Sequence, residues 1–200
     1  MDELFAANRA ELCGVVCRTP QYSHESRGIR FFTFPLETLR LSGAADQVNV
    51  VVREELLRRV PDAGERVRAE GELRSFNNRS GVGSRLVLTV YARLIEAGDG
   101  PDEDRIWLTG AVCKPPVFRV TPMGREICDI ILAVSRRYRR SDYIPVIAWG
   151  AQAREVSGCG VGTRLSLRGR LQSRQYTKLV DGQSVSRQAF EVSAAEIFPA

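Results

Sequence analysis

The chain has 200 residues, of which 44% are hydrophobic and 26% charged, and its formal net charge at pH 7 is +5. This composition provides enough apolar surface for one large domain or for two small domains of about 100 residues each. No run of 18 apolar residues is present, and the first residues, MDELFAANRAEL, are acidic. We therefore expect neither a membrane-spanning helix nor an export signal.

Few side chains are available for metal or catalytic chemistry. The chain has five cysteines and one histidine, His24, with no C-x-x-C pair, so reduced, buried thiols are favoured over a zinc site. The P-loop, H-E-x-x-H and G-x-S-x-G motifs are absent, and no two carboxylates have a spacing typical of acid–base catalysis. We expect no enzyme activity, no metal and no cofactor, and a cytoplasmic location.

The charge is concentrated in the C-terminal half. Residues 1–100 contain 14 basic and 14 acidic side chains, whereas residues 105–200 contain 15 basic and seven acidic ones, a net charge of +8. The segment GDGPDED (Gly98–Asp104) lies between the halves and has the composition of an interdomain break. A basic half attracts polyanions, although a merely well-solvated surface has the same composition.

The two halves also repeat each other. CGVVCR (Cys13–Arg18) aligns with TGAVCK (Thr109–Lys114), and VNVVV (Val48–Val52) aligns with IPVIA (Ile144–Ala148), both at a shift of 96 residues. The shift becomes 98 for GERVRAEGEL and GTRLSLRGRL, and 102 for SRLVLTVYARLI and SRQAFEVSAAEI. Matches in the same order with small, loop-sized steps indicate a tandem duplication.

In chain order, each copy is predicted to form three strands, a short helix and two more strands. The first copy places REELLRRV (Arg53–Val60) at the helix. Strands of the second copy are predicted from alternating or β-branched stretches, and its helix is AQAREV. These predicted elements are Ile106–Cys113, Glu126–Val134, Tyr143–Trp149, Ala151–Val156, Arg164–Tyr176 and Ala189–Phe198.

This order predicts an all-β protein made of two tandem OB-fold barrels, each a five-stranded Greek-key barrel with a short helix between strands 3 and 4. Residues 1–97 form the first, degenerate domain, residues 98–104 the linker and residues 105–200 the second domain. Two internal glycines, Gly110 and Gly169, fall where strands of a small barrel must bend.

Residues 104–198 resemble the bacterial single-stranded DNA-binding (SSB) proteins. The resemblance is carried by LAVSRRY (Leu132–Tyr138), YIPVIAWGAQARE (Tyr143–Glu155) and GRLQSRQY (Gly169–Tyr176), with Asp104 and Gly110 in the opening strand. For the first copy, the resemblance to the family rests mainly on its alignment with the second copy. Since the family assembles four barrels, two barrels per chain imply a homodimer. Members of the family usually end in a Gly/Pro/Gln-rich stretch with an acidic tip that recruits other proteins, whereas this sequence ends in AAEIFPA, so the resemblance leaves the protein partners unknown.

The resemblance also implies which residues bind nucleic acid. Aromatic rings stack on bases without reading their sequence, and arginines pair with phosphates or stack on bases. A strand alternates its faces, so Tyr143 and Trp149 share one face, which could also be core. Trp107 is expected in the core or in a subunit interface. The residues implied in binding are Tyr138, Tyr143, Trp149, Tyr176, Arg136, Arg137, Arg139, Arg140 and Arg174.

The first copy lacks the stacking rings. At the repeat shifts, the four aromatic positions of the second copy are occupied by Ser42, Gln47, Arg53 and Asn78. We therefore expect the first copy to be a structural partner or a reduced binder.

The sequence thus favours sequence-tolerant binding and protection of single-stranded DNA, in replication, recombination or repair, by a protein associated with the nucleoid. Two alternatives remain at this point. One is an OB-fold adaptor that docks proteins of a primosome or replisome, and the other is a binder of single-stranded RNA, because stacking does not read the 2′-hydroxyl.

Overall fold

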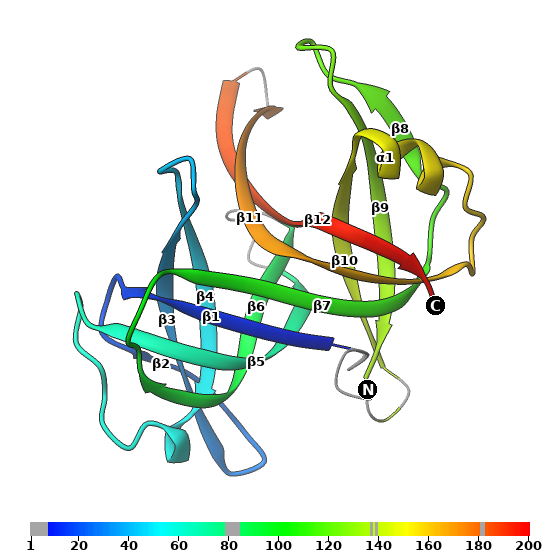
Figure 1. Ribbon diagram of the computed structural model, residues 1–200. Coiled ribbons are helices and arrows are strands. Elements are labelled where there is room, and N and C mark those ends of the chain that lie inside the picture. The colour runs from blue at the N-terminus through cyan, green and yellow to red at the C-terminus, as the bar shows by residue number, and fades with distance from the viewer. Residues whose placement is uncertain (1–7, 79–84, 137, 139, 181–182) are drawn as a thin grey trace. The chain divides into compact units, whose positions relative to one another are not determined.

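The computed structural model describes residues 8–78, 85–136, 138, 140–180 and 183–200. The chain divides into two compact units (Figure 1). One consists of residues 9–74 and 88–106, and the other of residues 1–8, 75–87 and 107–200. Strands dominate both units, and the described residues contain one α-helix.

The first copy forms a closed barrel. Strand β1 pairs antiparallel with β3 and β5, β3 pairs antiparallel with β4, and β4 pairs in parallel with β6. Since β6 also neighbours β5, the ring closes in the order of an OB fold. Its elements are β1 (Asn8–Val16), β2 (Gln21–Ser26), β3 (Ile29–Leu39), β4 (Ala45–Arg53), the 3₁₀ turn η2 (Glu54–Leu56), β5 (Arg66–Asn77) and β6 (Leu86–Ala97).

The second copy repeats this arrangement. Strand β10 pairs antiparallel with β9 and in parallel with β12, which pairs antiparallel with β11, while β7 pairs with β9 and neighbours β11. Its elements are β7 (Glu103–Val112), β8 (Val117–Val120), β9 (Glu126–Ser135), β10 (Ser141–Trp149), α1 (Gly150–Ser157), β11 (Arg164–Val180) and β12 (Gln183–Pro199).

The strand registers agree with the shifts found in the sequence. Val50 on β4 lies opposite Val90 on β6, and Val146 on β10 lies opposite Val192 on β12. These pairs are related by shifts of 96 and 102 residues, the values that align the two copies. The two barrels therefore keep the same register, as a tandem duplication predicts.

The core of each barrel is built from alternating strand residues. Phe34 and Leu36 on β3 and Val48 on β4 are almost fully buried, as are Leu132 on β9 and Ile144 on β10. Burial of each such side chain stabilises the fold by about 1.5–3 kcal/mol. The two copies thus have matching apolar layers.

Predicted glycine positions coincide with close backbone approaches. A Cβ atom at Gly169 would overlap the carbonyl oxygen of Ser193, and one at Gly110 would lie 2.8 Å from that of Ala133. Gly169 also lies at a shift in the register between β11 and β12. Both glycines therefore allow strands to approach or bend, as expected for a small barrel.

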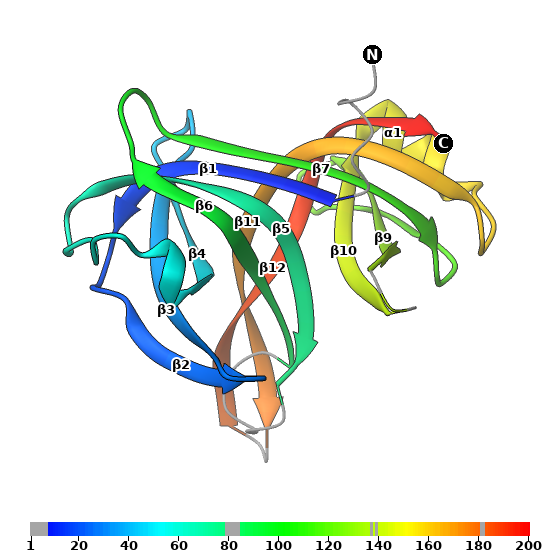
Figure 2. The ribbon, with the colours of Figure 1, turned by 90° about the horizontal axis from the view of Figure 1, so that it is seen from below.

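Each copy differs from the predicted five strands by an additional short strand. Strand β2 forms a hairpin with β3, and β8 forms one with β9. The second hairpin of the second copy, β11–β12, is long and remains paired as far as Val180 and Gln183 (Figure 2).

The helical inserts also differ between the copies. Helix α1 forms as predicted and buries Ala153 and Val156. In the first copy, the helix predicted over Arg53–Val60 is only the 3₁₀ turn η2, none of whose residues is buried. Pro61 disfavours a helical conformation at Val60, and without a buried apolar stripe a short helix is not stable.

The predicted linker is anchored to the first barrel. Residues 98–102 connect β6 to β7, and the Asp102 carboxylate accepts hydrogen bonds from the Leu39 amide at 2.6 Å and from the Arg66 guanidinium at 2.7 Å. All five cysteines are free thiols. No helix within the described parts of the chain is long and apolar enough to cross a membrane.

Candidate nucleic-acid interface

The outer face of β10 presents two of the predicted aromatic residues. Ile144 and Val146 point into the core, so Tyr143 and Trp149 point outward, with exposed fractions of 53% and 36%. The alternative that both rings pack in the core does not describe the structure. Their apolar ring surface is available to a ligand.

Trp149 is held in place by one polar contact. Its indole Nε1 donates a hydrogen bond of 3.0 Å to the hydroxyl of Ser193 on the parallel neighbour β12. The contact fixes the edge of the ring while Trp149 as a whole stays more than one third exposed. A ring that is ordered before binding loses less conformational entropy when a base stacks on it.

Tyr138 lies in the loop between β9 and β10 and is 87% exposed. Its backbone has a φ of +62°, a left-handed conformation that costs a residue with a Cβ about 1–2 kcal/mol. Glycine would be the residue expected there if only the turn mattered. The exposed ring therefore has no packing role that would offset this strain, and the position is a candidate for binding.

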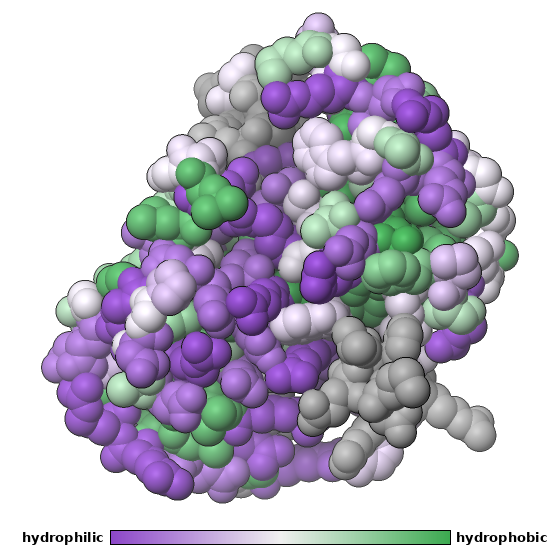
Figure 3. Space-filling model, in the orientation of Figure 1, coloured by the Kyte–Doolittle hydropathy of each residue, from purple (hydrophilic) through white to green (hydrophobic). Residues whose placement is uncertain are grey.

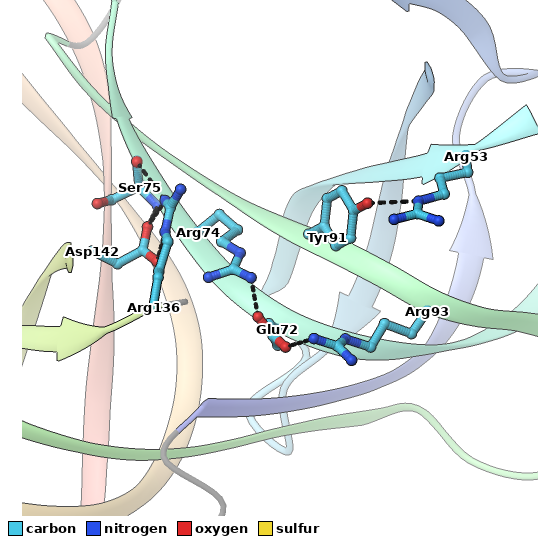
Figure 4. Close-up of polar contacts among 8 residues, drawn as sticks. All are labelled: Arg53, Glu72, Arg74, Ser75, Tyr91, Arg93, Arg136 and Asp142. Carbon is cyan, nitrogen blue, oxygen red and sulfur yellow. Dashed lines mark hydrogen bonds and ion pairs between the residues drawn. The ribbon is translucent and has the colours of Figure 1, made fainter. Parts of the chain in front are cut away.

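The two loop arginines that the structure describes, Arg136 and Arg140, differ in their contacts. Arg140 is exposed and has no ion-pair partner among the residues that the structure describes. Arg136 instead forms a two-pronged ion pair with the fully buried carboxylate of Asp142 (Figure 4). Arg137 and Arg139 lie outside the described residues. Of the described pair, Arg140 is thus the one placed to meet a phosphate.

Two acidic side chains on the strands next to β10 are paired with polar groups. Glu191 on β12 accepts a hydrogen bond of 3.1 Å from Gln172 and lies 3.3 Å from the guanidinium of Arg174. Arg119 on β8 forms a 2.7 Å ion pair with Asp129 on β9. These contacts offset carboxylates that would otherwise repel a nucleic acid.

Arg174, predicted from the sequence, thus lies on β11 with its side chain half exposed beside Glu191. Tyr176 also belongs to β11, opposite Arg187 on β12, but its side chain lies outside the described residues.

The first barrel has a different set of side chains on its corresponding face. Gln47 is exposed, and Arg53 occupies the position that Trp149 has in the second barrel. Arg53 donates a hydrogen bond of 2.9 Å to the hydroxyl of Tyr91, which occupies the position of Ser193 (Figure 4). Both barrels thus have a hydrogen bond between side chains at these two positions. In the second barrel the ring is on β10 (Trp149), whereas in the first barrel it is on β6 (Tyr91).

This face of the first barrel contains rings that the repeat alignment missed. His24 stacks on Phe31 with a centroid distance of 4.7 Å and an interplanar angle of 10°, and Phe31 lies 6.0 Å from Tyr91. Phe31 is itself buried, whereas His24 is exposed and Tyr91 is partly exposed.

The surface around these rings is mixed in charge. Glu72 pairs with both Arg74 and Arg93 (Figure 4). The view in Figure 3 shows the first barrel as mostly hydrophilic, with small hydrophobic patches. Arg30 and Arg59 are likewise paired with Glu54 and Glu65, so several arginines of this barrel are occupied by acidic partners.

An OB barrel that exposes rings among arginines belongs to the class of barrels suited to single-stranded nucleic acids. The chain belongs to the single-strand binding protein family, whose model matches residues 104–198. It is 34% identical over 101 residues to a single-stranded DNA-binding protein of Clostridium tetani, a match that covers 47% of this chain and 68% of that protein.

The chain is also similar to a second relative and, in its fold, to a solved structure. The chain is 34% identical over 80 residues to the single-stranded DNA-binding protein A of Bacillus subtilis, covering 36% of this chain and 46% of that protein. The chain thus spans about half the length of this relative. The fold matches the crystal structure of the wild-type single-stranded DNA binding protein from Thermus aquaticus, with a TM-score of 0.78 at 20% identity, over 96% of this chain and 92% of that one.

Proposed function

We propose that the protein binds single-stranded DNA without sequence preference and protects it during replication, recombination or repair. The observation that carries this proposal is the outward placement of Tyr143 and Trp149 on one face of β10. Membership of the family supports it, as does the name of the Clostridium tetani relative.

The proposed mechanism combines stacking with charge neutralisation. Each base that stacks on a ring contributes about 1–3 kcal/mol. Arg140 and Arg174, with the arginines at 137 and 139, pair with phosphates and release counterions. Tyr138, Tyr143, Trp149 and Tyr176 supply the rings. The protein acts as a binding protein in the cytoplasm, on the nucleoid, and no step requires a catalytic residue.

We further propose that residues 105–200 form the main binding domain and that residues 1–97, joined by residues 98–104, contribute less. The outward Tyr143 and Trp149 support this ranking, because Gln47 and Arg53 stand at their positions in the first copy. Two barrels per chain would give four in a homodimer, the assembly that the sequence predicts.

Tryptophan fluorescence tests the proposal. The chain has two tryptophans, Trp107 and Trp149, so single-tryptophan variants made with Trp107→Phe and Trp149→Phe separate their signals. Addition of oligo-dT is expected to quench the emission of Trp149, because its ring stacks on a base, and to leave that of Trp107 nearly unchanged. Saturating oligo-dT with no change at Trp149, while binding is seen by another probe, would remove this ring from the site.

A further inference from the structure

The duplication repeats one buried ion pair with the same atoms. In the first barrel, Nε and one terminal nitrogen of Arg40 donate to the two carboxylate oxygens of Asp46, at 2.7 and 2.6 Å. In the second barrel, the same atoms of Arg136 donate to Asp142. Both carboxylates are fully buried, and the arginine side chains are 27% and 25% exposed.

The loop between the paired residues is closed in the same way in both copies. The amide of Arg40 donates to the carbonyl of Ala44 at 2.8 Å, and that of Arg136 donates to the carbonyl of Arg140 at 2.7 Å. The ion pair therefore joins the end of one strand to the start of the next and fixes the short loop between them.

The two loops have different side chains at equivalent positions. The loop of the first copy presents Ser42 and Ala44, whereas the loop of the second presents Tyr138 and Arg140 at the same positions. Strand β10 then begins, and Tyr143 directly follows Asp142. The same ion pair thus holds a loop with Ser42 and Ala44 in the first copy and a loop with Tyr138 and Arg140 in the second.

Asp142 has further partners within its own compact unit, to which residues 75–87 belong. Its carboxylate accepts the amide hydrogen of Ser75 at 2.5 Å, and Arg136 donates to the Ser75 carbonyl at 3.2 Å (Figure 4). The Ser75 hydroxyl accepts the amide hydrogen of Tyr143 at 2.8 Å. The guanidinium of Arg136 therefore donates both to the Asp142 carboxylate and to the Ser75 carbonyl.

We propose that Arg136 and Asp142 are positioning residues, which hold the rings of Tyr138 and Tyr143 in place for the nucleic acid, and that Arg136 does not neutralise a phosphate. The proposal rests on the proposed function. It changes the role of Arg136 from the phosphate contact predicted from the sequence to a structural support of the stacking loop. A guanidinium that leaves Asp142 for a phosphate would leave a buried carboxylate without its cation, which is strongly unfavourable.

The test replaces each ion pair by a neutral pair of similar size. Arg136→Met with Asp142→Asn removes one positive and one negative charge, so the net charge of the protein does not change. The side-chain amide that Asp142→Asn introduces keeps an oxygen for the backbone amide of Ser75. The matched control is Arg40→Met with Asp46→Asn in the first barrel, and Arg140→Ala serves as the reference for a lost phosphate contact.

Affinity for labelled oligo-dT is measured by fluorescence anisotropy at several salt concentrations, and unfolding by urea is followed by circular dichroism. Both double variants are expected to lose stability, and the second-barrel variant at least as much as the control, because it also loses the hydrogen bond to the Ser75 carbonyl. The second-barrel variant is expected to bind about tenfold more weakly, the effect of losing roughly one stacked base. Its log–log salt slope stays at the wild-type value, while Arg140→Ala flattens that slope by about 0.7.

The same variants show faster hydrogen exchange in their respective loops, at residues 136–142 or 40–46. If the second-barrel variant flattens the salt slope as much as Arg140→Ala, Arg136 contacts a phosphate and the proposal is overturned. Unchanged affinity despite faster exchange would overturn it as well. If the double variant does not fold, Arg136→Lys replaces it, because lysine keeps a cation for a phosphate but cannot make the two-pronged contact with Asp142. Weaker binding with faster exchange in the loop then supports the positioning role, and wild-type affinity overturns it. Failure of the wild-type protein to bind oligo-dT would instead refute the proposed function.

Discussion

Replacement of Tyr138 by glycine is expected to weaken the binding of single-stranded DNA without destabilising the fold. The ring is 87% exposed, so its removal costs little packing, and the backbone φ of +62° suits glycine. Relief of the left-handed strain contributes about 1–2 kcal/mol to stability. The greater freedom of glycine in the unfolded chain costs about 0.5–1 kcal/mol. The net effect on the free energy of unfolding is therefore between none and a gain of about 1.5 kcal/mol.

The loss in affinity follows from the ring alone. One base that no longer stacks reduces the binding free energy by about 1–3 kcal/mol. Tyr138→Ala is the matched control, because alanine also lacks the ring but keeps the strained backbone with a Cβ. Both variants should bind equally weakly, and only the glycine variant should gain stability.

Urea unfolding monitored by circular dichroism gives the stability, and anisotropy of labelled oligo-dT gives the affinity. A glycine variant that is less stable than the wild type by more than about 1 kcal/mol would mean that the ring packs on the protein. Wild-type affinity in both variants would mean that Tyr138 does not contact a base.

The remaining predictions address the two barrels, the assembly and the thiols. Trp149→Ala with Tyr143→Ala should cost about 2–6 kcal/mol of single-stranded DNA affinity through two lost stacking contacts, and Gln47→Ala with Arg53→Ala much less; equal losses in folded variants would contradict the proposed ranking of the barrels. Analytical ultracentrifugation should find a homodimer, and a monomer at all concentrations would refute it. Burial, with a smaller effect of Asp129, raises the pKa of the Cys128 thiol, so less thiolate is present at neutral pH. Iodoacetamide should therefore modify Cys128 far more slowly in the native protein than in urea, as measured by mass spectrometry, and equal rates would contradict its burial.

The fold could be predicted from the sequence because the duplication repeats the residue pattern of each barrel strand. The shifts of 96 and 102 residues predicted the equivalence of β4 with β10 and of β6 with β12, which the registers of Val50 and Val146 confirm. The alternation along β10 indicated that Tyr143 and Trp149 share a face. Only the structure shows that this face is the outer one.

Other features depend on contacts between distant residues. The helix predicted after β4 is only a 3₁₀ turn, because Pro61 disfavours a helical conformation before it and no residue of the turn is buried. Helix propensity alone therefore overestimates the helical content of this segment. The partner of Arg136 was missed because an arginine run is typical of a solvated or phosphate-binding loop, and nothing local marks Asp142 as buried. The ring of Tyr91 was missed because its position in the other copy, Ser193, carries no ring.

A titration of labelled oligo-dT, oligo-rU and duplex DNA at about 50 and about 200 mM salt tests the central claim most directly. The exposed rings of β10 require unpaired bases, so oligo-dT should bind much more tightly than the duplex. Its affinity should fall with salt at a log–log slope of about −0.7 per phosphate neutralised. Stronger binding of oligo-rU than of oligo-dT would favour an RNA ligand. Equal affinity for duplex and single strands, or no binding of any of the three, would contradict single-stranded DNA binding by this surface.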